Sequence, residues 1–195
     1  MILPYVINSS MEPARIVHPL SASLTLNSEP VHTVTLSLEG DESVSALDWL
    51  CVTDPDGTKR YFRVNSTSND RIAGTQTAEL EHSLTALNFG MITPETAGAE
   101  VRVTGTGTEA LTTILTYQEN LFLGQKPFVL GQVDIPYVNL DVSDTTVLEA
   151  ITDILEMTPG YYIDTDESNY PWTLNILSKP ATYSCEGRLG RNLAG

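Results

Sequence analysis

The sequence predicts a mainly β protein with an α+β part, in which a small antiparallel β-barrel precedes an α+β domain. Three observations predict this class: polar and apolar residues alternate in short runs up to about residue 104, helical spacing begins after that residue, and a hairpin pattern follows the second helix. A hydrophobic content of 41% is enough to bury a core. We therefore expect a barrel over 1–104, an α+β domain over 105–184, and the start of a strand returning to the barrel over 185–195.

The barrel is predicted from short strands with one polar face. Residues 21–27 and 31–39 alternate with period two, which is typical of antiparallel sheet with one solvated side. Residues 46–53 are apolar on both faces and indicate a central strand, with Trp49 and Cys51 sharing one face. The apolar face of the first two strands carries Ala22, Leu24, Leu26, Val34, Leu36 and Leu38.

A hairpin and a long strand extend the β region. Residues 54–57, Asp-Pro-Asp-Gly, supply a proline with a preset φ and a glycine that tolerates a positive φ, so we expect residues 61–65 to return as a partner strand. Residues 75–87 alternate over an unusually long stretch, with His82 on the same face as Leu80. Many short strands separated by turns favour a small barrel or a sandwich.

Two helices are expected after residue 104. Thr106 and Glu109 have the spacing of a capping box, and Leu111, Ile114 and Leu115 follow at helical spacing.

The second helix has a clearer apolar stripe. We expect Ser143 or Asp144 to cap its N-terminus and Gly160 to end it in a left-handed conformation. The stripe consists of Val147, Leu148, Ile151, Ile154 and Leu155.

A β-hairpin is predicted from residues 161–164 and 172–177, which flank a polar turn. Asp164, Asp166, Glu167 and Asn169 carry the oxygen ligands that Ca²⁺ prefers. Their spacing lacks the Gly and the distal Glu of an EF-hand loop, so an ordinary solvated turn is the favoured interpretation.

The charge balance excludes two classes of partner. The chain has 25 Asp and Glu but only 10 Lys and Arg, which gives a formal net charge of -15, and the basic residues do not cluster. Nucleic-acid affinity comes from Lys and Arg displacing counterions, so specific nucleic-acid binding is not expected. An acidic surface also disfavours anionic membranes, and no apolar run approaches the roughly 20 residues of a membrane span.

The N-terminus and the cysteines indicate synthesis in the cytoplasm. Residues 1–5, Met-Ile-Leu-Pro-Tyr, lack the basic and apolar regions of a secretory signal. Cys51 and Cys185 are far apart and fit no metal-binding spacing, so we expect two reduced, buried thiols.

His82 is the most tempting catalytic residue, because Glu79 and Glu81 flank it. On a strand, however, both carboxylates point to the face opposite His82, which favours a hydrogen-bonded core or interface histidine. His18 and His32 stand alone, the chain has no Gly-X-Ser-X-Gly motif, and Gly105–Gly107 are not followed by a P-loop lysine. We expect no catalytic residue, no metal and no cofactor.

Three features together resemble a known family: the order of barrel and α+β unit, the segment Glu81–Leu87 (Glu-His-Ser-Leu-Thr-Ala-Leu) and the segment Arg188–Leu193 (Arg-Leu-Gly-Arg-Asn-Leu). They resemble the N-terminal hub region of phage tail proteins known as tail-associated lysins or prophage tail endopeptidases. In that family a Glu-His pair closes the first barrel region, and a Tyr-Gly-Lys-Asn-Leu-like string marks the return to the barrel. Leu189 here replaces the aromatic residue and Arg191 the lysine.

The resemblance implies a structural protein of the phage or prophage tail tip. It implies a homotrimer whose barrels form a pseudo-sixfold ring between the tail tube and the tip. The implied partners are the distal tail or tail tube protein and other tail-tip proteins, with the tape measure protein or DNA passing through the lumen without specific binding. The implied location is the virion tail, after synthesis in the host bacterial cytoplasm. Peptidoglycan cleavage in this family resides in later segments, so we expect the chain to be the start of a longer protein.

Two other functional classes are open. Tyr161, Tyr162, Tyr170 and Trp172 would form a stacking platform in a carbohydrate- or receptor-binding module, although a core position is favoured for most of them. A peptidoglycan hydrolase would need convergent carboxylates, and the sequence marks no such pair.

Overall fold

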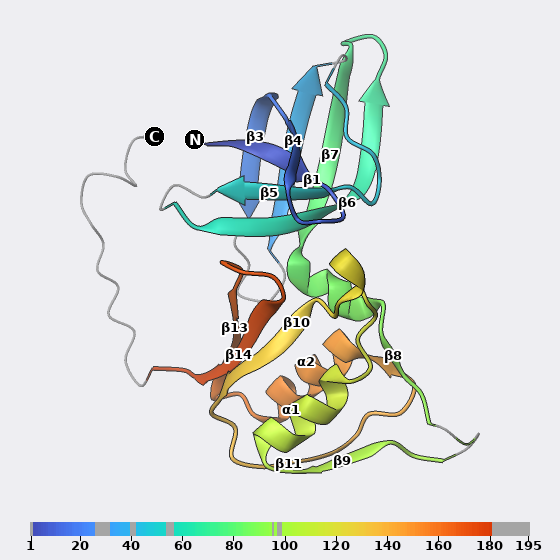
Figure 1. Ribbon diagram of the computed structural model, residues 1–195, viewed down its shortest axis with the longest axis vertical. Coiled ribbons are helices and arrows are strands. Elements are labelled where there is room, and N and C mark those ends of the chain that lie inside the picture. The colour runs from blue at the N-terminus through green and yellow to red at the C-terminus, as the bar shows by residue number, and fades with distance from the viewer. Residues whose placement is uncertain are drawn as a thin grey trace.

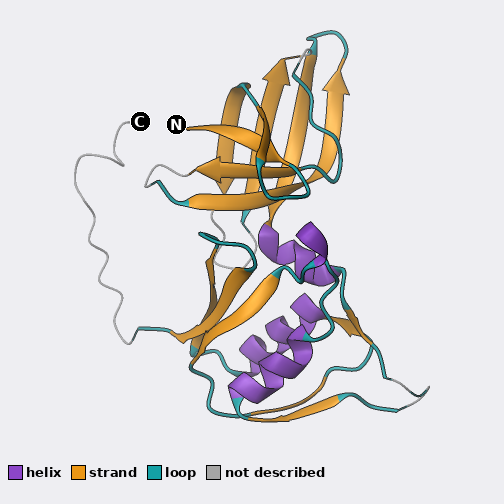
Figure 2. Cartoon of the chain, in the orientation of Figure 1, coloured by secondary structure: helices purple, strands orange, loops and turns teal. Residues whose placement is uncertain are grey.

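The computed structural model describes residues 2–25, 32–39, 42–53, 57–94, 96 and 99–180. A β-sheet forms one end of the molecule, and a layer of helices and smaller sheets forms the other (Figures 1 and 2). In the part of the chain that is described, no helix is long and apolar enough to cross a membrane.

The first part is an antiparallel sheet of seven strands in the order β2-β1-β5-β6-β7-β4-β3. Its strands are β1 (Ile2–Ile7), β2 (Pro13–Ile16), β3 (Pro19–Thr25), β4 (Thr33–Glu39), β5 (Trp49–Thr53), β6 (Lys59–Asp70) and β7 (Thr75–His82).

The mainly β class with an α+β part is confirmed, but the barrel is not. The sheet is open: β2 and β3 are its edges, and among the described residues no pairing joins them. The sheet bends instead at β6, where the register shifts between Val64 and Ser66. The first half of β6 pairs with β5 and the second half with β7. Alternation in the sequence predicts strands with one buried face, but it does not determine whether their sheet closes.

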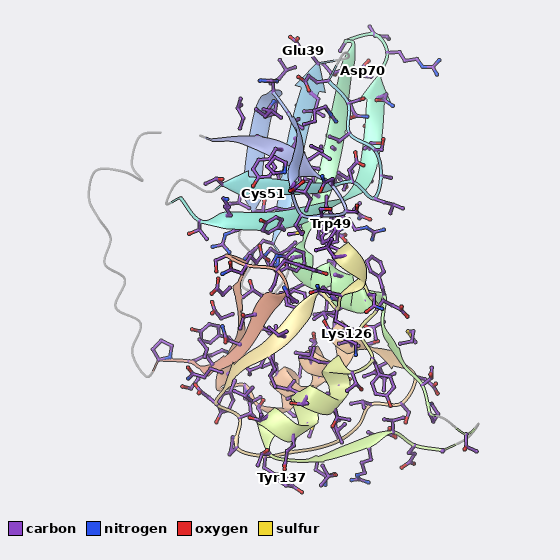
Figure 3. The ribbon with its side chains drawn as sticks, viewed as in Figure 1. Glu39, Trp49, Cys51, Asp70, Lys126 and Tyr137 are labelled. Carbon is purple, nitrogen blue, oxygen red and sulfur yellow. The ribbon has the colours of Figure 1, made fainter. Side chains whose placement is uncertain are left out.

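The central strand β5 separates two cores, as its apolar character on both faces predicted. Leu50 packs with the residues enclosed by the bent sheet. Trp49 and Cys51, on the opposite face, pack in a second core that continues into the α+β part. Trp49 lies on the side of the sheet that faces this part (Figure 3).

The second part is built on a three-stranded sheet in the order β10-β14-β13, with β10 parallel to β14 and β13 antiparallel to it. The predicted hairpin is therefore confirmed as β13 (Tyr161–Asp166) and β14 (Trp172–Ser178). The other elements are β8 (Met91–Ile92), β9 (Arg102–Gly105), α1 (Gly107–Leu115), η2 (Phe122–Gly124), β10 (Phe128–Val133), β11 (Val138–Asp141), β12 (Thr145–Thr146) and α2 (Val147–Met157).

Two of the short strands link residues on either side of position 104. β8 pairs with β12, and β9 pairs with β11, so Met91–Ile92 and Arg102–Gly105 take part in the second layer of structure. The division of the chain at residue 104 stays a prediction, as does the strand expected over 185–195, which lies outside the described residues.

The long strand expected over 75–87 ends early. β7 stops at His82, and residues 83–88 form the 3-10 helix η1 (Ser83–Asn88). The His82 Nδ1 atom accepts a hydrogen bond from the Leu84 N–H, and the Thr85 hydroxyl donates to the His82 carbonyl. Local hydrogen bonds from polar side chains thus replace the sheet ladder, although the alternation continues in the sequence.

Capping boxes begin both α-helices. The box predicted at Thr106 and Glu109 is confirmed. The second helix is capped by Thr146 and not by Ser143 or Asp144. The Ser143 hydroxyl is engaged elsewhere, because it donates to the Asp141 carboxylate and accepts from the Val101 N–H. Gly160, the expected left-handed end, is not among the described residues with a positive φ, and the helix ends at Met157.

We expect Thr146→Ala to lower the free energy of unfolding by about 1 kcal/mol, the usual cost of losing an N-cap side chain. Thr146→Ser retains the hydroxyl that accepts from the Glu149 N–H at 3.1 Å, and should cost much less. Urea denaturation of both variants measures the difference. Equal losses would show that the methyl group, not the cap, is responsible.

Candidate functional site

The described residues place a buried carboxylate, Glu167, at the junction of the sheet and the α+β part. Glu167 follows β13 and is 5% exposed. One carboxylate oxygen accepts from the Tyr61 N–H at 2.7 Å, and the other accepts from the Ser83 hydroxyl. A hairpin turn of the second part is thereby joined to β6 and η1 of the first.

His82 contacts the same carboxylate. Its Nε2 atom lies 3.0 Å from Glu167 Oε1, but the N–H is not aligned for a hydrogen bond, so the contact is electrostatic. The Nδ1 atom of His82 accepts from the Leu84 N–H. His82 is only 1% exposed.

The carboxylates that flank His82 in the sequence do not join it. Glu79 accepts from the Ser66 hydroxyl and Glu81 from the Asn65 side-chain amide, both at exposed positions across the strand pair. The opposite-face arrangement predicted from the strand period is therefore confirmed. The carboxylate that does meet His82, Glu167, comes from 85 positions further along the chain.

His32 stacks edge-on to His82, with ring centroids 5.4 Å apart. Its pKa is lowered, first by burial and then by the neighbouring His82 and Arg60, because each disfavours a further positive charge. His18 lies elsewhere, 2.9 Å from an oxygen of Glu42 at the surface. The three histidines thus form no common site.

An aromatic cluster surrounds Trp172 beside this polar contact. Trp172 is fully buried, and its ring centroid lies 5.3–5.7 Å from those of four neighbours in the cluster. These neighbours come from both parts of the molecule: Trp49, Tyr61, Phe128 and Tyr170. Offset and edge contacts of this kind add stability to the burial of apolar surface. The core position favoured for Trp172 is the one observed, and a buried ring cannot stack on a sugar.

Cys51 is a free, buried thiol, as predicted for it. Burial raises its pKa, which keeps the sulfur protonated and unreactive. Burial is also the main cause that raises the pKa of Tyr61 to about 12, with a further contribution from Cys51. Cys185 lies outside the described residues.

The residues considered for calcium diverge. Asp164 accepts from the Asn175 side-chain amide, Asp166 accepts from the Ser168 N–H, and Glu167 turns into the junction. Among the residues that the structure describes, no three His, Cys, Asp or Glu side chains are placed to hold a metal ion. Asp164 and Asp166 thus each accept a hydrogen bond within the hairpin, and the burial of Glu167 was not anticipated.

A groove of about 900 Å³ opens next to the junction. His32, Arg60 and His82 line it from the sheet side, while α2 and β13 form its other walls. The junction can orient two layers rigidly, since its polar and aromatic contacts cross between them.

Comparison with known proteins supports the fold and gives no family. No family model matches the sequence, and no curated protein is similar to it in sequence. Two solved structures share the fold. The prophage tail protein gp18 from Listeria monocytogenes EGD-e has 13% identity and a TM-score of 0.58 over 89% of this chain and 50% of its own. The tail protein from Neisseria meningitidis MC58 has 15% identity and a TM-score of 0.50 over 89% and 49%.

The chain spans about half the length of these two solved proteins. At 13–15% identity the likeness establishes a shared fold, including both the bent sheet and the α+β part, since 89% of this chain is covered.

Proposed function

We propose that this chain is a structural protein of a bacteriophage or prophage tail, located in the virion tail. The observation that carries the proposal is the fold shared over 89% of the chain with two tail proteins. A fold alone does not specify a function. The buried junction adds support, because the most elaborate polar contacts of the described residues hold two layers together and none of them opens a reaction centre.

Within the tail, we propose a place at the tip, as a hub that forms a trimeric ring between the tail tube and the tip. The open sheet supports this arrangement. Its edge strands β2 and β3 offer backbone hydrogen-bonding groups to a neighbouring subunit. Exposed apolar side chains accompany them: Ile16 is 54% exposed and Leu20 is 55% exposed. Three copies related by closed rotational symmetry would use such edges in a ring.

The proposed ring would have an acidic character, because each copy carries a formal net charge of -15. Acidic walls would let DNA or a tape measure protein pass without specific binding. The proposed role is structural and not catalytic.

The mass of the purified chain, measured by light scattering alone and with its neighbouring tail tube protein, tests the ring. We expect a particle of about three times 21.3 kDa, either alone or upon mixing. Leu20→Lys, which places a charge on the edge strand β3, should reduce the trimer without unfolding the chain. A strictly monomeric chain under both conditions would contradict the trimeric hub.

A further inference from the structure

Among the described residues, no strand pairs with the outer edge of β13, and this edge borders the groove. The Lys179 N–H donates to the Gly160 carbonyl at 2.7 Å, so Gly160 and Lys179 form a hydrogen-bonded pair of the antiparallel ladder. Such pairs alternate along the strands. The N–H and C=O groups of Ile163 and Thr165 therefore point away from β14, toward the free side of the sheet.

The direction of the backbone groups on β14 confirms this alternation of hydrogen-bonded and non-hydrogen-bonded pairs. The Ile176 carbonyl, which lies across from Ile163, accepts from the Asp134 N–H on the β10 side of the sheet. The groups of Ile176 and Ile163 thus point away from each other, as a non-hydrogen-bonded pair requires. Within the described chain, β13 has no partner on its other side.

The groove has the shape and lining for one added strand. Five consecutive residues of β13, from Tyr161 to Thr165, line it, which places the strand edge and not only one face against the open space. Opposite them lie α2 and the sheet residues His32 and Arg60. The apolar part of the lining is formed by Leu84, Leu148 and Leu155.

We infer that this groove is a strand-acceptor site, in which an extended peptide segment of another protein pairs with β13. Main-chain hydrogen bonds to Ile163 and Thr165 fix the register of the peptide against β13, as in other cases of strand addition to a free edge. Alternate side chains of the peptide face the apolar lining, so its sequence alternates apolar and polar residues. This inference stands independently of the proposed tail function.

Charged side chains of both signs lie along the groove. Arg60 lies on the sheet side, and the Lys179 ammonium donates to the Pro159 carbonyl at one end of β13. Glu156 and Asp164 lie on the helix and strand walls. A bound segment with charges of both signs, matched to these positions, fits better than one of a single sign.

Selection from a display library of random twelve-residue peptides tests the inference, with the full chain as the target. Thr165→Pro removes the N–H that faces the groove, and proline is tolerated on an edge strand. Thr165→Val keeps this N–H and is the matched control. We expect enriched peptides to alternate apolar and polar residues. They should bind Thr165→Pro about tenfold more weakly than Thr165→Val, the effect of one lost hydrogen bond at its upper range.

A second measurement does not depend on the folding of the proline variant. Selected peptides with N-methyl groups on alternate peptide bonds should lose binding in one of the two phases and retain it in the other, because only one set of N–H groups faces β13. Equal loss or equal retention in both phases would overturn strand pairing, and so would a failure of the library to enrich any peptide.

Two other occupants give distinct results that also overturn the inference. If a chain that ends at Pro180 binds peptides at least tenfold more tightly than the full chain, residues 181–195 are the occupant. If the full chain dimerises with rising concentration and Thr165→Pro abolishes the dimer, the occupant is a second copy.

Discussion

Replacing Trp172 with alanine is expected to lower the free energy of unfolding by about 3–5 kcal/mol, the usual cost of truncating a buried tryptophan. The effect should lie at the top of this range, because the indole is fully buried and contacts aromatic rings from both parts of the molecule. Urea denaturation followed by circular dichroism measures the loss.

The matched control is Tyr162→Ala, another aromatic residue of the same hairpin, which is 38% exposed. We expect its loss to be well below that of Trp172→Ala, because truncation there leaves no sealed cavity. Similar losses in the two variants would mean that Trp172 does not hold the two parts together as its contacts indicate.

Replacing Glu167 with alanine should have the second largest effect, a loss of about 2–5 kcal/mol. The substitution leaves the buried Tyr61 N–H and the Ser83 hydroxyl without their acceptor, and each unsatisfied buried group costs about 1–3 kcal/mol. Glu167→Gln retains one acceptor oxygen and should recover part of this loss.

Asp166→Ala is the control for Glu167, since Asp166 is an exposed carboxylate at the end of β13 that accepts from the Ser168 N–H. Thermal unfolding measures the melting temperatures of Glu167→Ala, Glu167→Gln and Asp166→Ala. If Asp166→Ala and Glu167→Ala lower the melting temperature equally, the carboxylate at the junction has no special structural role.

Local patterns in the sequence predict most of the first part of the fold. Period-two alternation locates the strands β3 and β4, an apolar run locates β5, and the capping box at Thr106 locates the first helix. These signals depend on residues close together in the chain. The pattern fails at Ser83, where alternation continues but local hydrogen bonds form a 3-10 helix. Whether the sheet closes depends on its edges, which no local pattern specifies.

The junction could not be predicted from the sequence, because its contacts are long-range. Glu167 meets Tyr61 and Ser83, which are 106 and 84 positions away. In the sequence it stands in a polar turn between acidic neighbours and has the composition of a solvated loop. β10 was missed for a related reason: Gly131 interrupts its apolar pattern, and its partner β14 lies beyond α2.

The two short motifs that resemble those of phage tail proteins lie at different places in the chain. One of the two motifs, Glu81–Leu87, closes β7 and forms most of η1, at the point where the chain passes from the sheet to the second part. The other, Arg188–Leu193, lies outside the described residues.

Immunogold electron microscopy of intact phage particles, with antibodies raised against this chain, tests the central claim most directly. We expect gold particles at one end of the tail, at its tip, and none on the capsid or along the tail tube. Particles from a phage with the gene deleted provide the control and should carry no label. Label confined to the capsid, or complete virions that lack the protein, would contradict a structural role in the tail.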